Sequence, residues 1–460
     1  MNHSSCCGSK IYLHVFASFH NFSLKLSTLD FFPFTAVEDL ISFRPSNFEL
    51  PYNCLDVKIH FISSRPTMTS SNPYRPFFLL DFSIHFLNHG SFGACPLPVF
   101  EAYQAWQRRL ESQPVLFLGR EFAALDHQAR IPLAEHLHTV PENLVFIPNA
   151  TQGVNIIARS LKLSPGDEIL TSDHEYGACD YTWEFICHQT GAAYKHQTIP
   201  LPASSLEEMA AQFWQGVTPR TRVIYLSHIT SPTALRLPVE IICRKAREAG
   251  IHTVVDGAHA PGQISLDLPA IGADFYIGNC HKWLLSPKGA GFLYVRPDLQ
   301  SQVLPLVVSW GYHATPEGSS GSQFVDYLQW TGTRDPSASL SVPAALQFMA
   351  DHDWEKVRTD AHQLLCQTIS HICFLTGLSP LAPLDSDLFF QMGIAPLPTE
   401  TNLLELKSLL YSYFRVEVPL IAWNEHKFVR ISIQAYNTPE DCDALLAGLA
   451  ELLPKVRLSN

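Results

Sequence analysis

The chain has 460 residues, of which 46% are hydrophobic and 16% charged, and its formal net charge is -12. This length can bury a large core in two or three domains, whereas the acidic balance argues against nucleic acid or an anionic membrane surface as partner. No apolar run reaches the roughly 18 residues that a membrane span needs, and the 11 cysteines lack the spacing of disulfide frameworks or zinc sites. We therefore expect a cytoplasmic enzyme that acts on a small molecule.

Residues 1–67 differ from the rest of the chain because they are rich in Phe, Ser and His but show neither helical nor alternating periodicity. They also lack the positive region and the continuous apolar region of a signal peptide. Ordinary patterning begins after Met68. We expect residues 1–67 to be a disordered or non-native extension, with a small extra element as the alternative, and residues 68–95 to form an N-terminal arm.

An α/β domain is predicted over residues 96–335, where helical patterns alternate with short apolar strands. Amphipathic helices are expected over 99–113 and 125–140, followed by a strand, a turn and a helix over 143–161. Four more strands end in polar residues, and they lie within 167–178, 222–232, 251–262 and 274–283. Ligands of open α/β sheets bind at the carboxyl ends of the strands, so these polar ends should converge on one site.

A smaller α+β domain is predicted over residues 336–460, beginning with a long helix. Alternating patterns typical of antiparallel strands follow within 389–397, 413–423 and 428–437. The last helix is expected within 438–456, where Thr438 and Asp441 are spaced as an N-terminal cap.

Lys282 lies in the apolar run "YIGNCHKWLLSPKGAGFLYV", which is typical of a buried strand and loop. Burial lowers the pKa of an amine, and an unprotonated amine can form a Schiff base with an aldehyde cofactor such as pyridoxal phosphate. The alternative is a lysine at a loop mouth whose ammonium group reaches water.

Asp256 ends an apolar strand in "VVDGAHAPGQ", where an isolated carboxylate is costly unless it pairs with a cation. A protonated pyridine nitrogen is such a cation, and an aspartate that keeps it protonated makes the ring an electron sink for a carbanion at the substrate's Cα. His259, three residues later, is placed to donate to the phenolic oxygen of the cofactor. The alternative is an aspartate that only turns the strand into a loop.

A phosphate site is predicted in "NATQGVN", where a strand turns through Asn149 into a helix that starts near Thr151. The free backbone N–H groups and the dipole of such a helix start attract anions, although a capped helix without a ligand is the alternative. His281 and Asn279 are candidates to complete the phosphate site. Tyr176 or His174 in "HEYGACDYTW" is a candidate to stack on the cofactor ring, with ordinary core packing as the alternative.

Taken together, these motifs resemble the class V aminotransferase family of fold-type I pyridoxal phosphate enzymes, from about Leu80 to Leu453. "FLNHGSFGACP", "DHEYGA", "GNCHKW" and "TGTRDPSA" are similar to its isopenicillin N epimerase-like branch. The resemblance implies the α/β fold-type I architecture, with a mostly parallel seven-stranded sheet between helices and a smaller C-terminal α+β domain. Ser231 departs from the pattern, because cysteine desulfurases commonly have asparagine there.

The resemblance also implies roles for individual residues. Lys282 would carry the Schiff base, and the pyridine ring would be held by Asp256, His259 and Tyr176. The cofactor phosphate would be held by Ala150, Thr151, Asn279 and His281, together with Thr333 of the other subunit of a homodimer. The substrate would be an amino acid whose carboxylate binds Arg430, with Asn88 and His89 as further substrate contacts.

The reaction itself stays open between two outcomes of one chemistry, which is proton removal from the Cα of an external aldimine to give a quinonoid carbanion. Reprotonation on the opposite face, by a group such as His89 or Tyr176, would give an epimerase. Loss of a β-substituent would give a carbon–sulfur lyase. A cysteine desulfurase is disfavoured because no cysteine lies between Cys373 and Cys442, and the intact set of site residues argues against an inactive binding relative.

Overall fold

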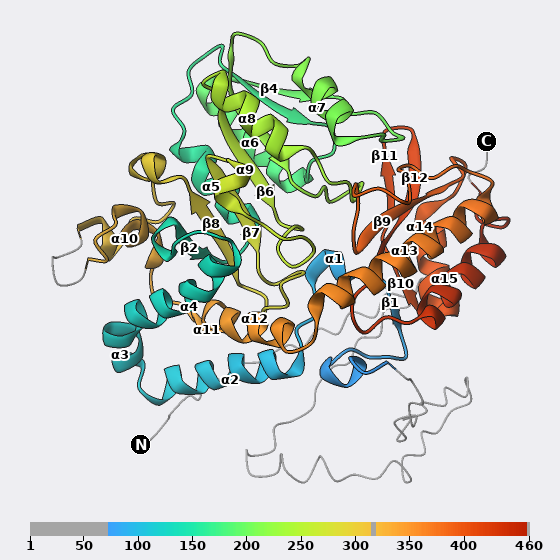
Figure 1. Cartoon of the computed structure of the whole chain (residues 1–460), viewed down its shortest axis with the longest axis horizontal. Coiled ribbons are helices and arrows are strands. Elements are labelled where there is room, and N and C mark those ends of the chain that lie inside the picture. Colours follow the sequence, from blue (N-terminus) through green and yellow to red (C-terminus); the bar gives the residue numbers. More distant parts are fainter. Residues whose placement is uncertain (1–71, 314–318, 458–460) are drawn as a thin grey trace, which may run out of the picture. The chain divides into compact units, whose positions relative to one another are not determined.

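The computed structural model describes residues 72–313 and 319–457, so the expectation for residues 1–67 lies outside the described residues (Figure 1). These ranges belong to one compact unit, Ser70–Asn460. Among the described helices, none is both long enough and apolar enough to cross a membrane. Every cysteine in the two ranges is a free thiol.

The described chain begins as an arm that lies along the C-terminal part of the fold. It contains the short 3-10 helix η4 (Arg75–Phe77), strand β1 (His85–Phe86) and helix α1 (His89–Phe92). Strand β1 pairs in parallel with β10 (Val416–Glu417), and Arg75 forms an ion pair of 2.9 Å with Asp441. The arm therefore carries α1 to the boundary between the two parts of the fold.

The main sheet has seven strands in the order β2-β8-β7-β6-β5-β3-β4. Their bounds are β2 (Leu144–Ile147), β3 (Glu168–Ser172), β4 (Ala193–Gln197), β5 (Thr221–Ser227), β6 (His252–Gly257), β7 (Phe275–Asn279) and β8 (Gly291–Val295). Strands β3 to β7 pair in parallel, and β8 is antiparallel to both of its neighbours. The predicted mostly parallel seven-stranded sheet is confirmed.

Helices cover both faces of this sheet, because alternate residues of its strands enter two separate cores. On β2, Val145 and Ile147 pack with helices α5 (Ala150–Ser160), α6 (Gly177–Thr190) and α10 (Gln323–Gln329). Leu144 and Phe146 enter the other core, with α4 (Phe122–His136), α7 (Leu206–Trp214) and α8 (Val239–Glu248). Burial on both faces explains why these strands read as continuous apolar runs.

The remaining helices of this part of the chain are α2 (Leu97–Ser112), α3 (Pro114–Leu116), the π-helix η5 (Phe117–Glu121), η6 (Pro141–Asn143), α9 (Leu268–Ile271), η7 (Pro297–Gln302) and η8 (Trp310–His313). Helices α11 (Ser337–Leu340) and α12 (Val342–Ala350) pack on α2 and α4. The predicted boundaries at 95/96 and 335/336 stay predictions.

The C-terminal part is an α+β unit, as predicted. Its antiparallel sheet has the order β11-β12-β9. The elements are α13 (Trp354–Thr376), β9 (Met392–Leu397), α14 (Leu403–Phe414), β10, β11 (Leu420–Trp423), β12 (His426–Ser432) and α15 (Pro439–Leu452). The strand expected over 413–423 is wrong at its start, because residues 413–414 end α14. The rest is split into β10 and β11 around Pro419, which has no N–H for a sheet ladder. The predicted cap of α15 is confirmed: Asp441 accepts a hydrogen bond of 3.0 Å from the Thr438 amide.

Candidate active site

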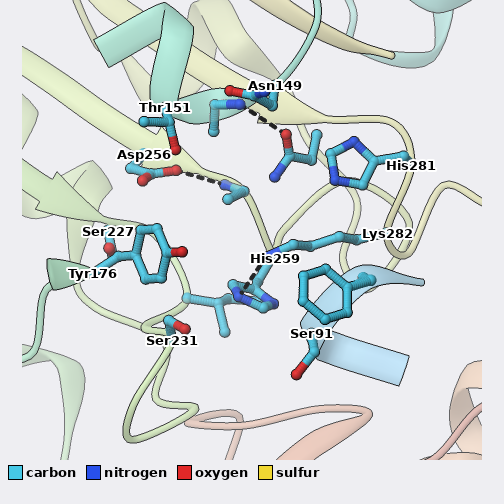
Figure 2. Close-up of a pocket in the computed structure, with 15 residues that line it drawn as sticks. Ser91, Asn149, Thr151, Tyr176, Ser227, Ser231, Asp256, His259, His281 and Lys282 are labelled. Carbon is cyan, nitrogen blue, oxygen red and sulfur yellow. Dashed lines mark hydrogen bonds between the residues drawn. The ribbon is translucent and has the colours of Figure 1, made fainter. Parts of the chain in front are cut away.

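A cavity of about 240 Å³ opens at the carboxyl ends of β5, β6 and β7, beside the start of α5 (Figure 2). The strand register explains the gathering of its polar residues, because Ser227 pairs with Asp256 and Asp256 with Ile277 on three adjacent strands. The cavity is lined by Ser91, Phe92, Asn149, Ala150, Thr151, Tyr176, Ser227, Ile229, Ser231, Asp256, Ala258, His259, Asn279, His281 and Lys282.

Lys282 enters this cavity from the loop that follows β7. Its Nζ lies 3.1 Å from Nε2 of His259, and within the described ranges it forms no ion pair with a carboxylate. Burial lowers the pKa of Lys282 to about 8, against the opposing effect of the Asp256 charge. Burial therefore favours the free amine of Lys282, which is the state that Schiff-base chemistry requires.

Asp256 lies at the end of β6 and is only 3% exposed. One carboxylate oxygen accepts from the Ala258 amide at 2.9 Å, and the other accepts from the Tyr225 hydroxyl at 3.2 Å and lies 3.7 Å from the Cys179 thiol. Burial raises the pKa of Asp256, and no cationic side chain of the described residues pairs with it. A cation that enters the cavity would complete this site.

The start of α5 supplies one free backbone donor. The Asn149 side chain accepts from the Gln152 amide at 3.0 Å, and the Ala150 amide donates to Oδ1 of Asn279 at 2.8 Å. Ala150 lines the cavity, and its amide is held by Asn279 in the protein without cofactor, so its predicted contact with a phosphate stays a prediction. The Thr151 amide has no protein partner in the described part of the chain, and Thr151 lines the cavity.

His281 faces the cavity next to this helix start. Its Nδ1 lies 3.1 Å from the carbonyl oxygen of Ala290, so Nδ1 carries a proton and Nε2 is left for a ligand. Burial lowers the pKa of His281 to about 4, and an anion at Nε2 would favour its protonated form. Thr333 is exposed and does not line this cavity, so its predicted role at the site of a second subunit stays a prediction.

The structure distinguishes between Tyr176 and His174, the two candidates for stacking on the cofactor ring. Tyr176 precedes α6, is 48% exposed and lines the cavity, where Figure 2 shows its ring pointing inward. His174 is fully buried, with hydrogen bonds of 2.7 Å to the Thr233 hydroxyl and the Ile199 carbonyl. Of the two stacking candidates, Tyr176 alone reaches the site.

Arg430 lies on β12, behind two serines that line the cavity. Its side chain contacts the carbonyl oxygen of Ser231, the Ser231 hydroxyl at 3.2 Å and the Ser91 hydroxyl at 3.2 Å. Arg430 is only 5% exposed, its Nε has no partner, and no carboxylate within the described residues pairs with it. Burial lowers the pKa of Arg430 to about 10, so the side chain is still a cation at neutral pH.

His89 and Asn88 lie behind the cavity, and neither lines it. His89 is 0% exposed, and its ring nitrogens contact the Tyr436 hydroxyl at 3.0 Å and the Lys282 carbonyl at 3.1 Å. Asn88 donates to Glu417 at 3.1 Å and accepts from Ser91 at 2.5 Å. These side chains support Lys282 and Ser91 from outside the cavity, and their predicted contact with the substrate stays a prediction.

Sequence reasoning missed several lining residues, namely Ser91, Phe92, Ser227, Ile229 and Ala258. Ser227 could have been found, because it ends one of the predicted strands. Its hydroxyl donates to Glu175 at 2.6 Å, and burial raises the pKa of that carboxyl to about 8. Ser91 lies in "FLNHGSFGACP", which indicated only the family, because its place at the cavity depends on long-range contacts such as the pairing of β1 with β10.

The donor set fits pyridoxal phosphate. A buried carboxylate without a cation suits the pyridinium nitrogen, a free amine suits the aldehyde, and an unpartnered helix-start amide suits the phosphate. These three groups are Asp256, Lys282 and Thr151, and all of them line the same cavity. Each is incomplete in the protein alone, and the cofactor would complete all three.

Comparisons with known proteins agree with this geometry. The family model described as aminotransferase class-V matches residues 93–383. Isopenicillin N epimerase of Amycolatopsis lactamdurans is 36% identical over 383 residues, which cover 81% of this chain and 96% of that protein. A probable chloroplastic L-cysteine desulfhydrase of Arabidopsis thaliana is 27% identical over 77% of this chain and 80% of its own length.

Solved structures show the same fold. A cystine C–S lyase in complex with cysteine persulfide has a TM-score of 0.69 at 24% identity, covering 80% of this chain and 97% of that one. The apo cysteine desulfurase of Thermococcus onnurineus NA1 has a TM-score of 0.72 at 17% identity, covering 85% and 100%. With the match to the family model over most of the chain, these findings identify the protein as a pyridoxal phosphate-dependent enzyme that belongs to the class V aminotransferase family.

Proposed function

We propose that this enzyme acts at the Cα of an amino acid, or of a compound that ends in one, and inverts its configuration as an isopenicillin N epimerase-like enzyme. The observation that carries the proposal is that a desolvated amine and a buried guanidinium without an ion-pair partner lie at the same cavity. Lys282 supplies the amine, and Arg430 borders the cavity through Ser91 and Ser231. The 36% identity to epimerases, over 96% of their length, favours inversion among the reactions of the family.

Each group has a defined task in this proposal. Bound pyridoxal phosphate supplies the electron sink that makes the Cα proton acidic. Arg430 binds the substrate carboxylate with its planar pair of N–H donors, and this orients the Cα. Lys282 takes the proton on one face. Asp256 keeps the pyridine nitrogen protonated, and His259 donates to the phenolic oxygen.

Inversion also needs a proton donor on the opposite face, and we assign that role to Tyr176. Figure 2 supports the assignment, because the Tyr176 hydroxyl and the Lys282 side chain point into the cavity from opposite sides. His89, the other candidate from the sequence, is fully buried with both ring nitrogens in contact with other groups. Tyr176 therefore combines two roles, stacking on the ring and carrying a proton.

A carbon–sulfur lyase is the second candidate, and the desulfhydrase relatives favour it. It needs the same Lys282 and Arg430 but no proton donor on the second face. A desulfurase is a weaker candidate, because none of the residues that line the cavity is a cysteine. An inactive relative is disfavoured by the complete set of Lys282, Asp256, His281 and Arg430.

The working enzyme is proposed to be a cytoplasmic homodimer with shared sites. Large apolar side chains are exposed along residues 304–312, namely Leu304, Leu306, Val307, Val308, Trp310 and Tyr312. Exposed apolar groups of this extent are typical of interaction surfaces. Thr333 is exposed as well, which supports its predicted contact with the cofactor phosphate of the other subunit.

A screen in deuterated water tests the proposal. The purified enzyme is incubated with isopenicillin N, common amino acids and cysteine conjugates, and deuterium at Cα, chirality and pyruvate are measured together. Deuterium uptake with inversion supports the epimerase, whereas pyruvate with release of a thiol or sulfide supports the lyase. If no α-amino acid shows either change, both candidates are wrong. Lys282→Ala is the control, and it should abolish both signals.

A further inference from the structure

The contact between Lys282 and His259 is one end of a chain of three side chains. His259 is 2% exposed, and each of its ring nitrogens has one polar side-chain partner. Nε2 lies 3.1 Å from Nζ of Lys282, and Nδ1 lies 3.3 Å from Nε1 of Trp283. Trp283 is fully buried, so it holds this position through packing on every side.

The chemistry of the indole group decides where the imidazole proton lies. An indole N–H only donates, so Nδ1 of His259 has to accept and cannot carry a hydrogen. A neutral imidazole has one N–H, which in this arrangement is on Nε2. This N–H faces Lys282 in the protein without cofactor, and it is the same N–H that the proposed function assigns to the phenolic oxygen when the cofactor is bound. The protonated imidazolium would bring two N–H groups together at Nδ1, and burial independently lowers the pKa of His259 well below its usual value.

The Nε2–H group can donate to Lys282 only when the lysine has a lone pair, which means that it is a neutral amine. We propose that Trp283 is a positioning residue that fixes the tautomer of His259 and thereby favours the free amine of Lys282 over its ammonium form. The inference rests on the assignment of Lys282 in the proposed function. It holds for epimerisation and elimination alike, because both use that amine.

Other charged groups face these two side chains, and they do not replace the Trp283 contact. Asp256 favours the ammonium form of Lys282, and Arg430 opposes it. His281 and His89 face His259 and disfavour its protonation. All of them act through space, whereas His259 is the one side chain of the described residues in hydrogen-bond contact with Nζ. The tautomer of His259 therefore decides whether the nitrogen next to Nζ is a hydrogen-bond donor or an acceptor.

The test measures the titration of Lys282 directly. The full-length chain is freed of cofactor, and trace labelling with acetic anhydride across pH is followed at Lys282 by mass spectrometry. In Trp283→Phe the histidine proton can move to Nδ1, and Nε2 then accepts from the lysine ammonium. We expect the titration midpoint of Lys282 to rise by about one pH unit, which means roughly tenfold less free amine below the midpoint. The visible absorbance that returns on reloading with pyridoxal phosphate should require correspondingly higher pH.

Two controls separate this effect from general loosening of the core. Trp423→Phe removes an indole that donates to the Asp173 carbonyl at 2.7 Å, outside the cavity lining, and should leave the midpoint unchanged. In a His259→Leu background, Trp283→Phe should cause no further shift, because the imidazole that transmits the effect is gone. An unchanged or lowered midpoint in Trp283→Phe alone would overturn the proposal.

A measurement on the unmodified enzyme covers the case in which Trp283→Phe does not fold. Histidine labelled with nitrogen-15 is incorporated, and His259→Leu identifies the signals of His259. We expect hydrogen on Nε2 and none on Nδ1, and hydrogen on Nδ1 would refute the inference. Borohydride reduction of the loaded enzyme separately checks whether Lys282 carries the cofactor, so a failure of that assignment is distinguished from a failure of the Trp283 inference.

Discussion

Replacing Arg430 by methionine should remove substrate binding without destabilising the fold. Burial lowers the pKa of Arg430 to about 10 from an ordinary value of 12.5, and this difference corresponds to about 3 kcal/mol of desolvation cost. The change also removes hydrogen bonds to Ser231 and Ser91, each of which contributes about 0.5–1.5 kcal/mol. The two effects nearly cancel, so we expect the free energy of unfolding to change by less than about 2 kcal/mol.

Activity should respond very differently to Arg430→Met. Loss of a bidentate charged contact in a dry site costs about 2–5 kcal/mol, which lowers catalytic efficiency tens-fold to thousands-fold. Cofactor retention should be unchanged, because none of the groups assigned to the cofactor contacts Arg430. Urea unfolding, cofactor absorbance and steady-state kinetics measure the three quantities on one preparation.

Arg130 is a matched control, because it is equally buried but paired. It forms an ion pair of 3.1 Å with the buried Asp126, and Arg130→Met would leave that carboxylate alone. Breaking such a pair costs about 3–5 kcal/mol of stability. If Arg430→Met destabilises the protein as much as Arg130→Met does, Arg430 is a structural residue and the reasoning fails. Unchanged substrate affinity would also refute it.

Tyr176→Phe should retain the cofactor and should still exchange the Cα proton of the substrate through Lys282, but it should no longer invert the configuration. Deuterium incorporation and chirality of the amino acid, both measured in deuterated water, check this. Mixed dimers of Lys282→Ala and Thr333→Ala chains should regain activity after subunit exchange, and absence of recovery would place both residues at the same site. His228 is buried with its pKa lowered to about 4, so stability should be lost as pH falls below about 6.5, by about 2 kcal/mol between pH 7 and pH 5. His228→Gln should reduce that loss in urea unfolding.

The sequence indicated the parts of the fold in which local pattern and final environment agree. β5, β6 and β7 were predictable because burial on both faces makes them continuous apolar runs. β4 (Ala193–Gln197) was missed because it is an edge strand of half-buried and polar residues. β8 was not separated from the loop around Lys282, since its antiparallel return depends on pairing between β2 and β7 that no local pattern reports.

The same distinction applies to the site. Asp256, Thr151 and Lys282 follow predicted elements directly, so their gathering followed from the topology of a parallel sheet. The contact of Asn279 with the Ala150 amide joins residues 129 positions apart, and the enclosure of His89 depends on Tyr436. Such contacts are set by long-range packing. They decide which of several chemically suitable residues is left free for a ligand.

The residues left free share one physical property, which links stability to function in this enzyme. Asp256 and Arg430 are both buried ionisable groups that form no ion pair among the described residues, so each makes the protein without ligands less stable than a paired group would. In the proposed function, the pyridinium nitrogen would carry the charge opposite to Asp256, and the substrate carboxylate the charge opposite to Arg430. Because a ligand stabilises the folded state in proportion to its preference for that state, cofactor and substrate should each raise the stability that these groups lower. Because the fold leaves both groups without an ion pair, we expect the site to prefer a cation beside Asp256 and an anion beside Arg430.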